Sequence, residues 1–225
     1  MDTGTFGAWL RGHALLPDGT APKRWDGKDV SAKGSAAVFA MDVTSPLQQA
    51  TETAVRLYGQ YLFESGQHGR IAFHFASGFY FPWVRWSNGE RIDPNKRTMA
   101  WRSVADTDSS AANLAKYLDV QYNFTNIHSL TTQDLMSVDI GSLTPGDVLV
   151  NLRGSVAFVA DMAVNTAGQR SVLLLSGGTP ARQLTILDNP GSQNKPWYDV
   201  PADGRGTFRL NDYGYDWSVL MRFRP

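Results

Sequence analysis

The sequence predicts an α+β fold in a single domain, with helices packed on a mostly antiparallel sheet or half-barrel. Two observations predict this class. In the first half of the 225 residues, apolar side chains recur at helical spacing, whereas the later part consists of short apolar runs between turns. The chain has no internal repeat and no Pro- or Gly-rich linker, so we assign residues 1–225 to one domain.

We divide this domain into residues 1–35, 36–142 and 143–225. The first part is rich in Gly, Pro, Asp and Lys, which predicts an irregular arm with a short hairpin at residues 25–28. The second part contains the predicted helices and a dense aromatic stretch, and the third is the predicted β-rich part.

The clearest predicted helix spans residues 45–65. Ser45 is a good N-cap, and the proline that follows it suits the first helical turn. Apolar residues then recur at helical spacing and form one face, and Gly66 is a typical residue just past a helix end. Strands are expected on either side of this helix, at residues 36–43 and 70–75.

An aromatic run at residues 79–86 follows, and Pro82 excludes it from a central strand. A second helix is predicted from about residue 108 to about residue 119, with leucines on its buried side. A short polar helix is expected at residues 132–136. The helical part therefore precedes the sheet in the chain.

The β-rich part is a series of short apolar runs bounded by Gly- and Pro-containing turns. The alternation of such runs with turns is typical of antiparallel strands. The predicted strands are residues 148–152, 156–164, 171–175, 184–187, 208–210 and 217–223.

Composition excludes several classes of function. Basic and acidic residues both number 21, and without a basic run the neutral chain is a poor candidate for binding nucleic acid. The longest apolar runs are far shorter than the ~20 residues that cross a bilayer, so no membrane span is predicted. Cysteine is absent, which excludes disulfides, thiolate metal sites and every cysteine nucleophile.

Neither a metal nor another cofactor is predicted. The histidines are scattered without the spacing of metal ligands: His13, His68, His74 and His128. The sequence also lacks the glycine-rich motifs that bind phosphates at the start of a helix.

Aromatic residues make up 12% of the chain, more than a core alone usually needs, which indicates an aromatic-lined cleft. Clefts are commonly assembled from turn-proximal segments that are far apart in sequence. We predict that such segments contribute six ligand-binding residues: His74, Ser77, Trp86, Arg91, Asp161 and Tyr198.

Several of these residues also have a purely structural interpretation. His74 is either a half-buried histidine bonded to a backbone carbonyl or a base of the site. Trp86 and Arg91 are either a packed cation–π pair or a platform for a sugar ring or peptide. Asp161 interrupts an apolar strand, so it needs a partner such as Arg56 or Arg91.

A family resemblance adds to these predictions. Short motifs follow one another along nearly the whole chain: Phe6-Gly7-Ala8-Trp9-Leu10-Arg11, Leu47-Gln48-Gln49, Phe75-Ala76-Ser77-Gly78-Phe79, Pro145-Gly146-Asp147-Val148, Asp161-Met162-Ala163, Asn189-Pro190 and Pro196-Trp197-Tyr198. In this order they resemble the bacterial domain-of-unknown-function family 4846. Members of that family are typically exported or lipid-anchored envelope proteins, so the resemblance implies a periplasmic or cell-surface location. It implies no established activity, and the first residues of this chain lack the pattern of a signal peptide.

The predicted architecture is also similar to that of NlpC-type cell-wall peptidases, in which a helix precedes a strand opened by Pro-Gly-Asp-Val. Those enzymes carry a Cys at the start of the helix and a His at the start of the second strand, because the thiolate needs an adjacent base. Ala50 and Ser155 stand at these positions here, and Gln60 replaces a carboxylate. The resemblance therefore implies the scaffold without its thiol chemistry.

Two functions fit this sequence. The first is an envelope module that binds a small glycan or peptide in an aromatic cleft without cleaving it. The second is a hydrolase of cell-wall or other glycans, which would use two carboxylates as acid and as nucleophile or base. The candidate carboxylates are Glu64, Glu90, Asp147 and Asp161. Their spacing favours no pair, so no catalytic residue is assigned.

Overall fold

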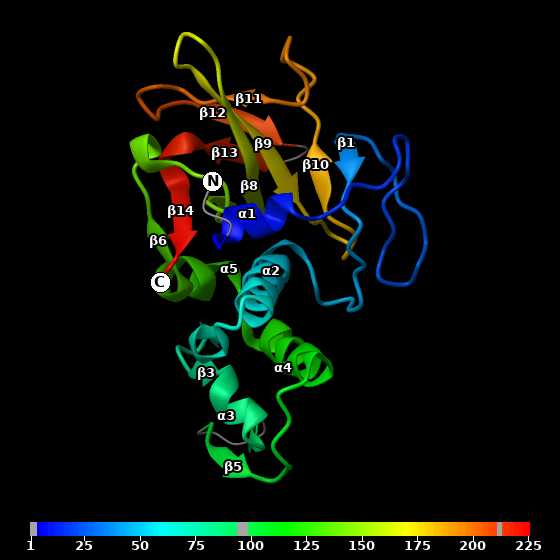
Figure 1. The fold of residues 1–225 in the computed structure, drawn as a ribbon, viewed down its shortest axis with the longest axis vertical. Coiled ribbons are helices and arrows are strands. Elements are labelled where there is room, and N and C mark those ends of the chain that lie inside the picture. The colour runs from blue at the N-terminus through cyan, green and yellow to red at the C-terminus, as the bar shows by residue number, and fades with distance from the viewer. Residues whose placement is uncertain (1–3, 94–98, 211–212) are drawn as a thin grey trace.

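A computed structural model describes residues 4–93, 99–210 and 213–225. It confirms an α+β fold in one domain, with a large antiparallel sheet and a few helices. In Figure 1 the sheet fills the upper part of the molecule, and helices α2 (Ala50–Glu64) and α4 (Ala111–Phe124) lie below it. The molecule is elongated, with the sheet toward one end and these helices toward the other (Figure 1).

The main sheet has eight strands among the described residues, and all its strand pairs are antiparallel. Strand β11 (Tyr198–Asp199) pairs with one end of β9 beside the continuous path. Along that path the order is β1 (Ser35–Val38), β10 (Thr185–Leu187), β9 (Arg170–Ser176), β8 (Ser155–Val164), β7 (Val148–Asn151), β14 (Leu220–Phe223) and β6 (Leu135–Ser137).

Smaller elements surround the sheet. Three two-stranded units pair β2 (Ala72–His74) with β3 (Tyr80–Pro82), β4 (Glu90–Ile92) with β5 (Trp101–Ser103), and β12 (Thr207–Leu210) with β13 (Tyr213–Asp216). The shorter helical segments are α1 (Phe6–Arg11), α3 (Trp83–Ser87), α5 (Ile127–Ser129), η1 (His68–Arg70), η2 (Leu130–Asp134), η3 (Ile140–Ser142) and η4 (Trp217–Val219).

Helix α2 begins at Ala50, five residues later than predicted. The Ser45 hydroxyl does accept the N–H of Leu47 (3.3 Å), but residues 45–49 form a separate turn before the helix. Gln49 is the residue that precedes the helix. A capped turn and a first helical turn carry the same signals in a sequence, so the pattern could not separate them.

Helix α1 lies inside the arm that was predicted to be irregular, and that prediction was wrong there. The Thr5 hydroxyl caps it by accepting the N–H of Ala8 (3.2 Å). Six residues are too few to show a helical period, and the helix is stabilised by packing on the sheet. The predicted turn at residues 25–28 is confirmed by the hydrogen bond from the Arg24 N–H to the Lys28 carbonyl (2.8 Å).

Three further boundaries differ from the sequence prediction. Helix α4 starts after the N-cap Ser110 and extends to Phe124, beyond the predicted end at residue 119. The predicted strand at residues 217–223 begins with the turn η4, where Asp216 accepts the N–H of Ser218 (2.9 Å). The polar helix predicted at residues 132–136 is the wide turn η2 followed by β6. Side-chain caps mark the starts of α4 and η4, at Ser110 and Asp216.

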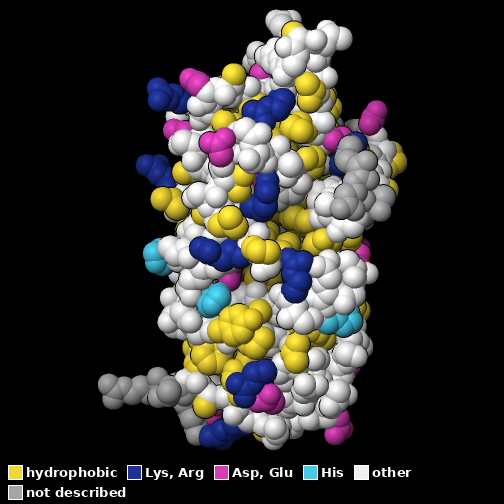
Figure 2. Space-filling model, turned by 60° about the vertical axis from the view of Figure 1, so that its left-hand side comes forward, with side chains coloured by type: hydrophobic (Ala, Val, Ile, Leu, Met, Phe, Trp, Pro, Cys, Tyr) yellow, Lys and Arg dark blue, Asp and Glu magenta, His cyan; other side chains and the backbone are white. Residues whose placement is uncertain are grey.

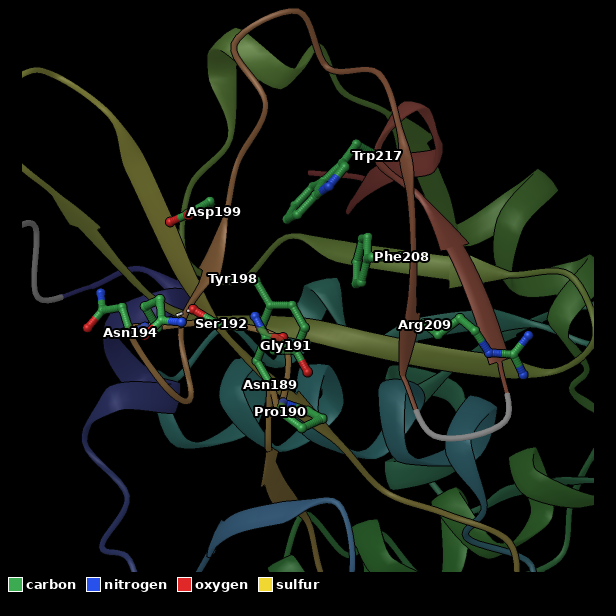
Figure 3. A pocket seen from close by; sticks show the side chains of 11 residues that line it. Asn189, Pro190, Gly191, Ser192, Asn194, Tyr198, Asp199, Phe208, Arg209 and Trp217 are labelled. Carbon is green, nitrogen blue, oxygen red and sulfur yellow. Dashed lines mark hydrogen bonds between the residues drawn. The ribbon is translucent and has the colours of Figure 1, made fainter.

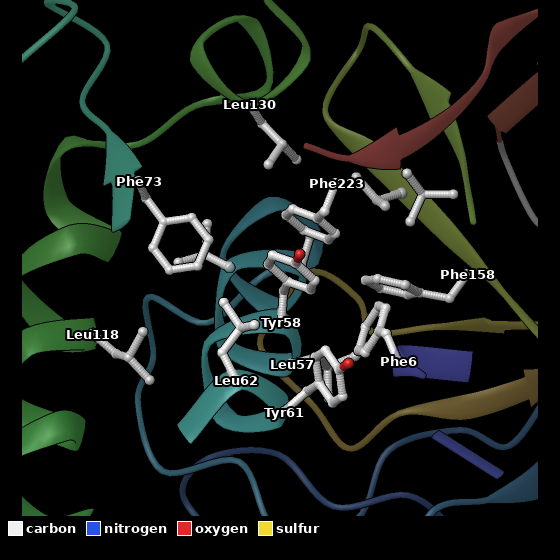
Figure 4. Close-up of a cluster of buried hydrophobic side chains, with 14 of the residues drawn as sticks. Phe6, Leu57, Tyr58, Tyr61, Leu62, Phe73, Leu118, Leu130, Phe158 and Phe223 are labelled. Carbon is white, nitrogen blue, oxygen red and sulfur yellow. The ribbon is translucent and has the colours of Figure 1, made fainter. Parts of the chain in front are cut away.

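Hydrophobic side chains fill both faces of the main sheet. Neighbouring residues of β8 alternate between the two, since Phe158 belongs to the cluster on the helical side and Val159 to the other. Figure 4 shows the helical side, where the Tyr58 and Phe223 rings stack with centroids 4.0 Å apart. On the opposite face the β12–β13 hairpin and η4 supply the covering residues, among them Trp217.

Charged side chains are spread over the surface. Figure 2 shows one face, on which Lys and Arg side chains follow one another from the upper to the lower half between apolar patches. None of the helices that the structure describes has both the length and the apolar character needed to cross a bilayer.

Candidate functional site

His74 and Ser77 lie together in the β2–β3 hairpin. The Nδ1 of His74 is 2.7 Å from the Oδ1 of Asp134, and the His74 N–H donates to Oδ2 of the same carboxylate (3.3 Å). Burial raises the pKa of Asp134, and the hydrogen bonds from His74 oppose that rise. The partner of His74 is therefore a carboxylate rather than a backbone carbonyl. Ser77 is exposed in the turn between the two strands.

Trp86 and Arg91 lie together between α3 and β4. The guanidinium carbon of Arg91 is 3.9 Å from the Trp86 ring centroid. The indole N–H donates to Oδ1 of Asn113 (2.9 Å), and Arg91 donates to the backbone carbonyls of Trp86 and Glu90 (2.7 Å each). The pair is thus packed as a cation–π contact, with one face of the indole covered by Arg91.

Asp161 has the ion-pair partner that its place in an apolar strand requires, but neither Arg56 nor Arg91 supplies it. Its Oδ1 is 3.2 Å from Nε of Arg11 on α1, and both side chains are about one-third exposed. Arg56 instead donates to the Asp42 carbonyl and to Gln48 (2.6 and 2.8 Å). The ion pair fixes α1 on β8.

The remaining predicted residue, Tyr198, lies on the side of the main sheet that faces away from α2 and α4. Its hydroxyl donates to the Asp188 carbonyl (2.6 Å), and the ring centroids of Tyr198 and Phe208 are 5.6 Å apart. The six predicted residues thus occupy four separate places: β2–β3, α3–β4, β8 and β11. Of these, Tyr198 lines one of the three cavities described below.

The carboxylates considered for glycan hydrolysis are also dispersed. Glu64 accepts the indole N–H of Trp9 (2.7 Å), and Glu90 pairs with Arg85. Asp147 is buried against Arg222. None of these, nor Asp161, lines the cavities described next.

Two cavities adjoin one another beside the β12–β13 hairpin. The first, of about 690 Å³, lies between the loop at residues 189–194 and the hairpin (Figure 3). The second, of about 830 Å³, shares Asp199, Phe208 and Trp217 with the first. We call the two cavities together the hairpin groove.

The hairpin groove combines aromatic and amide groups. Phe208 is half-buried, and its ring lies 4.8 Å from that of Trp217. In Figure 3 the loop with Asn189, Ser192 and Asn194 lies across from these rings. Asp199 is the carboxylate of both cavities, and it accepts a hydrogen bond from the Ser171 hydroxyl (2.7 Å). Flat rings opposite polar side chains suit a ligand with both apolar faces and hydroxyl or amide groups.

A third cavity, of about 810 Å³, lies at the start of α2 and shares Pro190 and Arg209 with the first. Ala50 and Ser155, the two positions singled out in the sequence-based comparison with NlpC-type peptidases, both line it. The Ser155 and Tyr215 hydroxyls are 2.6 Å apart, and burial raises the pKa of Tyr215 to about 12. Among the lining residues there is neither a thiol nor an imidazole.

Sequence reasoning missed Phe208, Trp217 and Arg182, which line the cavities. Phe208 and Trp217 belong to segments that were predicted as strands, without any prediction of the face they cover. Arg182 follows Ser176-Gly177-Gly178, which a sequence shows as an ordinary turn. The close approach of the Arg182 side chain to Gly178 carries no signature in the sequence.

Fold and cavities together define a single-domain α+β protein with open cavities that are partly aromatic and partly polar. The chain belongs to the family described as domain of unknown function (4846), whose model matches residues 1–222. No curated protein and no solved structure matches the chain. The similarity to NlpC-type peptidases accordingly has no support from a relative or a structural neighbour.

Proposed function

We propose that this protein is a binding module that holds a glycan or peptide in the hairpin groove without cleaving it. The observation that carries this proposal is the half-buried Phe208 ring, which packs on the buried rings of Tyr198 and Trp217 and lies opposite the polar loop at residues 189–194. The apolar face of a sugar ring or a peptide side chain packs on such rings. Amide and hydroxyl groups of the loop both donate and accept hydrogen bonds, as hydroxyl-rich ligands require.

Binding is favoured over hydrolysis by the carboxylates of the groove. A glycosidase of the common two-carboxylate type needs two carboxyl groups about 5–9.5 Å apart. Asp199 is the carboxylate that lines both cavities, and it is already bonded to Ser171. The third cavity offers hydroxyls but no thiol or imidazole among its lining residues. The binding proposal therefore predicts that the ligand is not cleaved.

The place of action that we propose is the periplasm or the cell surface of a bacterium. The support is the resemblance to exported and lipid-anchored members of the family. The ligands to test first are accordingly fragments of the cell wall, namely peptidoglycan glycans and their stem peptides.

The test is calorimetric titration of the wild-type protein and of Phe208→Ala with peptidoglycan fragments, stem peptides and chito-oligosaccharides. Phe208 is the half-buried ring shared by both cavities, so its loss should weaken binding about tenfold or more, which is about 1.4 kcal/mol. Tyr80→Ala is the matched control, because Tyr80 is an aromatic side chain that is 55% exposed on the distant β2–β3 hairpin. It should bind like the wild type.

Mass spectrometry of each ligand after incubation separates the two functions. Unchanged ligand masses together with a selective loss in Phe208→Ala support a binding module. New product masses contradict it and favour the hydrolase. Equal affinities of wild type and Phe208→Ala would show that the ligand does not bind in the hairpin groove.

A further inference from the structure

The third cavity contains an arginine for which the described residues supply no ion-pair partner. Arg182 lines this cavity, and its side chain lies against Gly178, where a Cβ atom would be 2.8 Å from the guanidinium carbon. Its Nε is buried and makes no hydrogen bond to any described residue. Burial lowers the pKa of Arg182. Since arginine stays charged in proteins, the guanidinium retains an unmet demand for an acceptor.

The residues around Arg182 are held in place by hydrogen bonds. The Thr179 hydroxyl donates to Oε1 of Gln49 (2.8 Å), which ties the loop before Arg182 to the start of α2. The Ser176 hydroxyl donates to the Val156 carbonyl (2.7 Å) and so joins β9 to β8. These two hydrogen bonds connect the segment before Arg182 to α2 and to β8.

A second buried polar atom lies beside the cavity without a partner. The Thr53 hydroxyl is fully buried and has no hydrogen bond to a described residue. It packs against Gly177, which lines the cavity, since a Cβ at Gly177 would be 3.0 Å from Oγ1 of Thr53. Ala50, in the first turn of α2, lines the cavity too, and the N–H groups of a first helical turn have no partners within the helix.

The charges around the cavity favour an anion. Among the lining residues that the structure describes, Lys33 and Arg182 are basic and Asp188 is the acidic one, and Arg209 lies at the border with the first cavity. We propose that this cavity binds the oxyanion group of a small ligand, a carboxylate or a phosphate, with Arg182 as the main donor. A planar guanidinium donates two parallel hydrogen bonds to either group. The proposal is independent of glycan or peptide binding in the hairpin groove.

The test follows amide resonances in two-dimensional NMR spectra while sodium phosphate or, separately, sodium acetate is added at constant ionic strength. We expect saturable shifts at Ala50, Gly177, Gly178 and Ser155, whose backbone lies on the cavity wall. Arg182→Gln should weaken the binding of the anion at least about tenfold. Saturation with phosphate alone identifies a phosphate site, and saturation with acetate as well identifies a general oxyanion site.

Two more variants sharpen the test. Arg153→Gln removes an equal charge from an exposed residue next to Gly154, without removing a lining side chain, and should change the affinity less than about twofold. Gly178→Ala keeps Arg182 but places a methyl group where its guanidinium now lies, so it should weaken binding as Arg182→Gln does. The dispersion of the other amide resonances checks that each variant is folded.

Three results would overturn the proposal. They are the absence of saturable shifts with both anions in the wild type, shifts that map away from the cavity, and equal affinities of wild type and Arg182→Gln. The first two concern the wild type alone, so the proposal is tested even if a variant does not fold. Loss of glycan binding in Phe208→Ala has no bearing on them.

Discussion

Asp147 is an acidic side chain buried in the core, where its ion pair with Arg222 offsets the cost of burying its charge. It is 1% exposed, and Arg222 donates to both of its oxygens, from Nε to Oδ1 (2.6 Å) and from Nη2 to Oδ2 (2.9 Å). The N–H of Thr144 also donates to Oδ2 (2.9 Å). Such a two-pronged pair is geometrically specific, and a charge left alone at this depth is costly.

Removal of Arg222 should therefore destabilise the protein strongly. For Arg222→Met we expect the free energy of unfolding to fall by about 3 kcal/mol, because Asp147 stays buried and loses its counter-charge. Urea denaturation measures this. The double variant Arg222→Met/Asp147→Asn should regain part of the loss, since the buried charge is gone.

The exposed pair Arg85–Glu90 is the matched control. Arg85→Met should cost less than about 1 kcal/mol, because water solvates the separated charges. Similar losses in Arg222→Met and Arg85→Met would contradict the role that we give to the burial of Asp147.

The sequence predicted the environment of single residues only where their neighbours in the chain determine it. The need of Asp161 for a basic partner follows from its apolar neighbours, and the structure confirms such a partner. The identity of that partner, Arg11, depends on the docking of a six-residue helix about 150 positions earlier in the chain, for which the sequence has no local signal. Tyr198 was predicted as a cleft residue from its aromatic turn, and it does line a cavity.

At the scale of elements, α1 packs so closely on the turn before β7 that position 7 has room only for a glycine. A Cβ at Gly7 would overlap the Pro145 carbonyl and lie 2.7 Å from the Pro145 Cβ. Gly146 approaches the same spot from the other side, with φ of 97° and its own Cβ position 2.9 Å from the Gly7 nitrogen. This contact lets the helix lie flat on the sheet.

Gly7→Ala should accordingly be destabilising, although alanine is the better helix former. The gain in helix propensity of about 1 kcal/mol is outweighed by overpacking of about 1–3 kcal/mol or more. Urea denaturation should show a lower midpoint for Gly7→Ala. Gly69→Ala serves as the control, because nothing lies within 4 Å of the added methyl group there. An unchanged or higher midpoint for Gly7→Ala would show that α1 is not packed as described.

Helices and strands were predicted well where the hydrophobic pattern repeats over several residues. They were predicted poorly where tertiary contacts determine the secondary structure. The strands β7 to β10 lie close to their predicted ranges, because alternation and flanking turns mark them. Their partners are a different matter: β14 from the end of the chain lies between β7 and β6. The β12–β13 hairpin covers one face of the sheet, and this placement creates the hairpin groove, which no local pattern specifies.

For the whole molecule, the buried tyrosines determine stability at high pH. Burial raises the pKa values of Tyr58, Tyr117, Tyr122, Tyr198 and Tyr215, in the last case to about 12. An unfolded chain loses these protons near about pH 10, so above that pH the folded state binds more protons than the unfolded one. Stability from these groups is fully present below about pH 10 and is lost as the pH rises through the folded-state values.

We therefore expect these five tyrosines to ionise together with unfolding. Tyrosinate absorbance and far-ultraviolet circular dichroism, recorded on the same samples across an alkaline titration, should show the later part of the absorbance rise coinciding with the loss of secondary structure. Ionisation of all 8 tyrosines near about pH 10 with native circular dichroism would contradict the burial described here.

The fold class was accessible from the sequence because patterning repeats over many residues. The arrangement of the candidate site was not, because it depends on which distant turns meet. His74, Trp86 and Tyr198 share the sequence context of cleft residues, yet they lie on separate parts of the molecule.

The central claim, that a ligand is bound in the hairpin groove and left intact, is tested most directly by NMR mapping of a peptidoglycan fragment on the wild-type protein. We predict amide shifts at residues 189–194 and 207–209, with the fragment's own resonances unchanged in number over time. Shifts centred on His74 or on the Trp86–Arg91 pair, or new resonances from cleaved product, would contradict it.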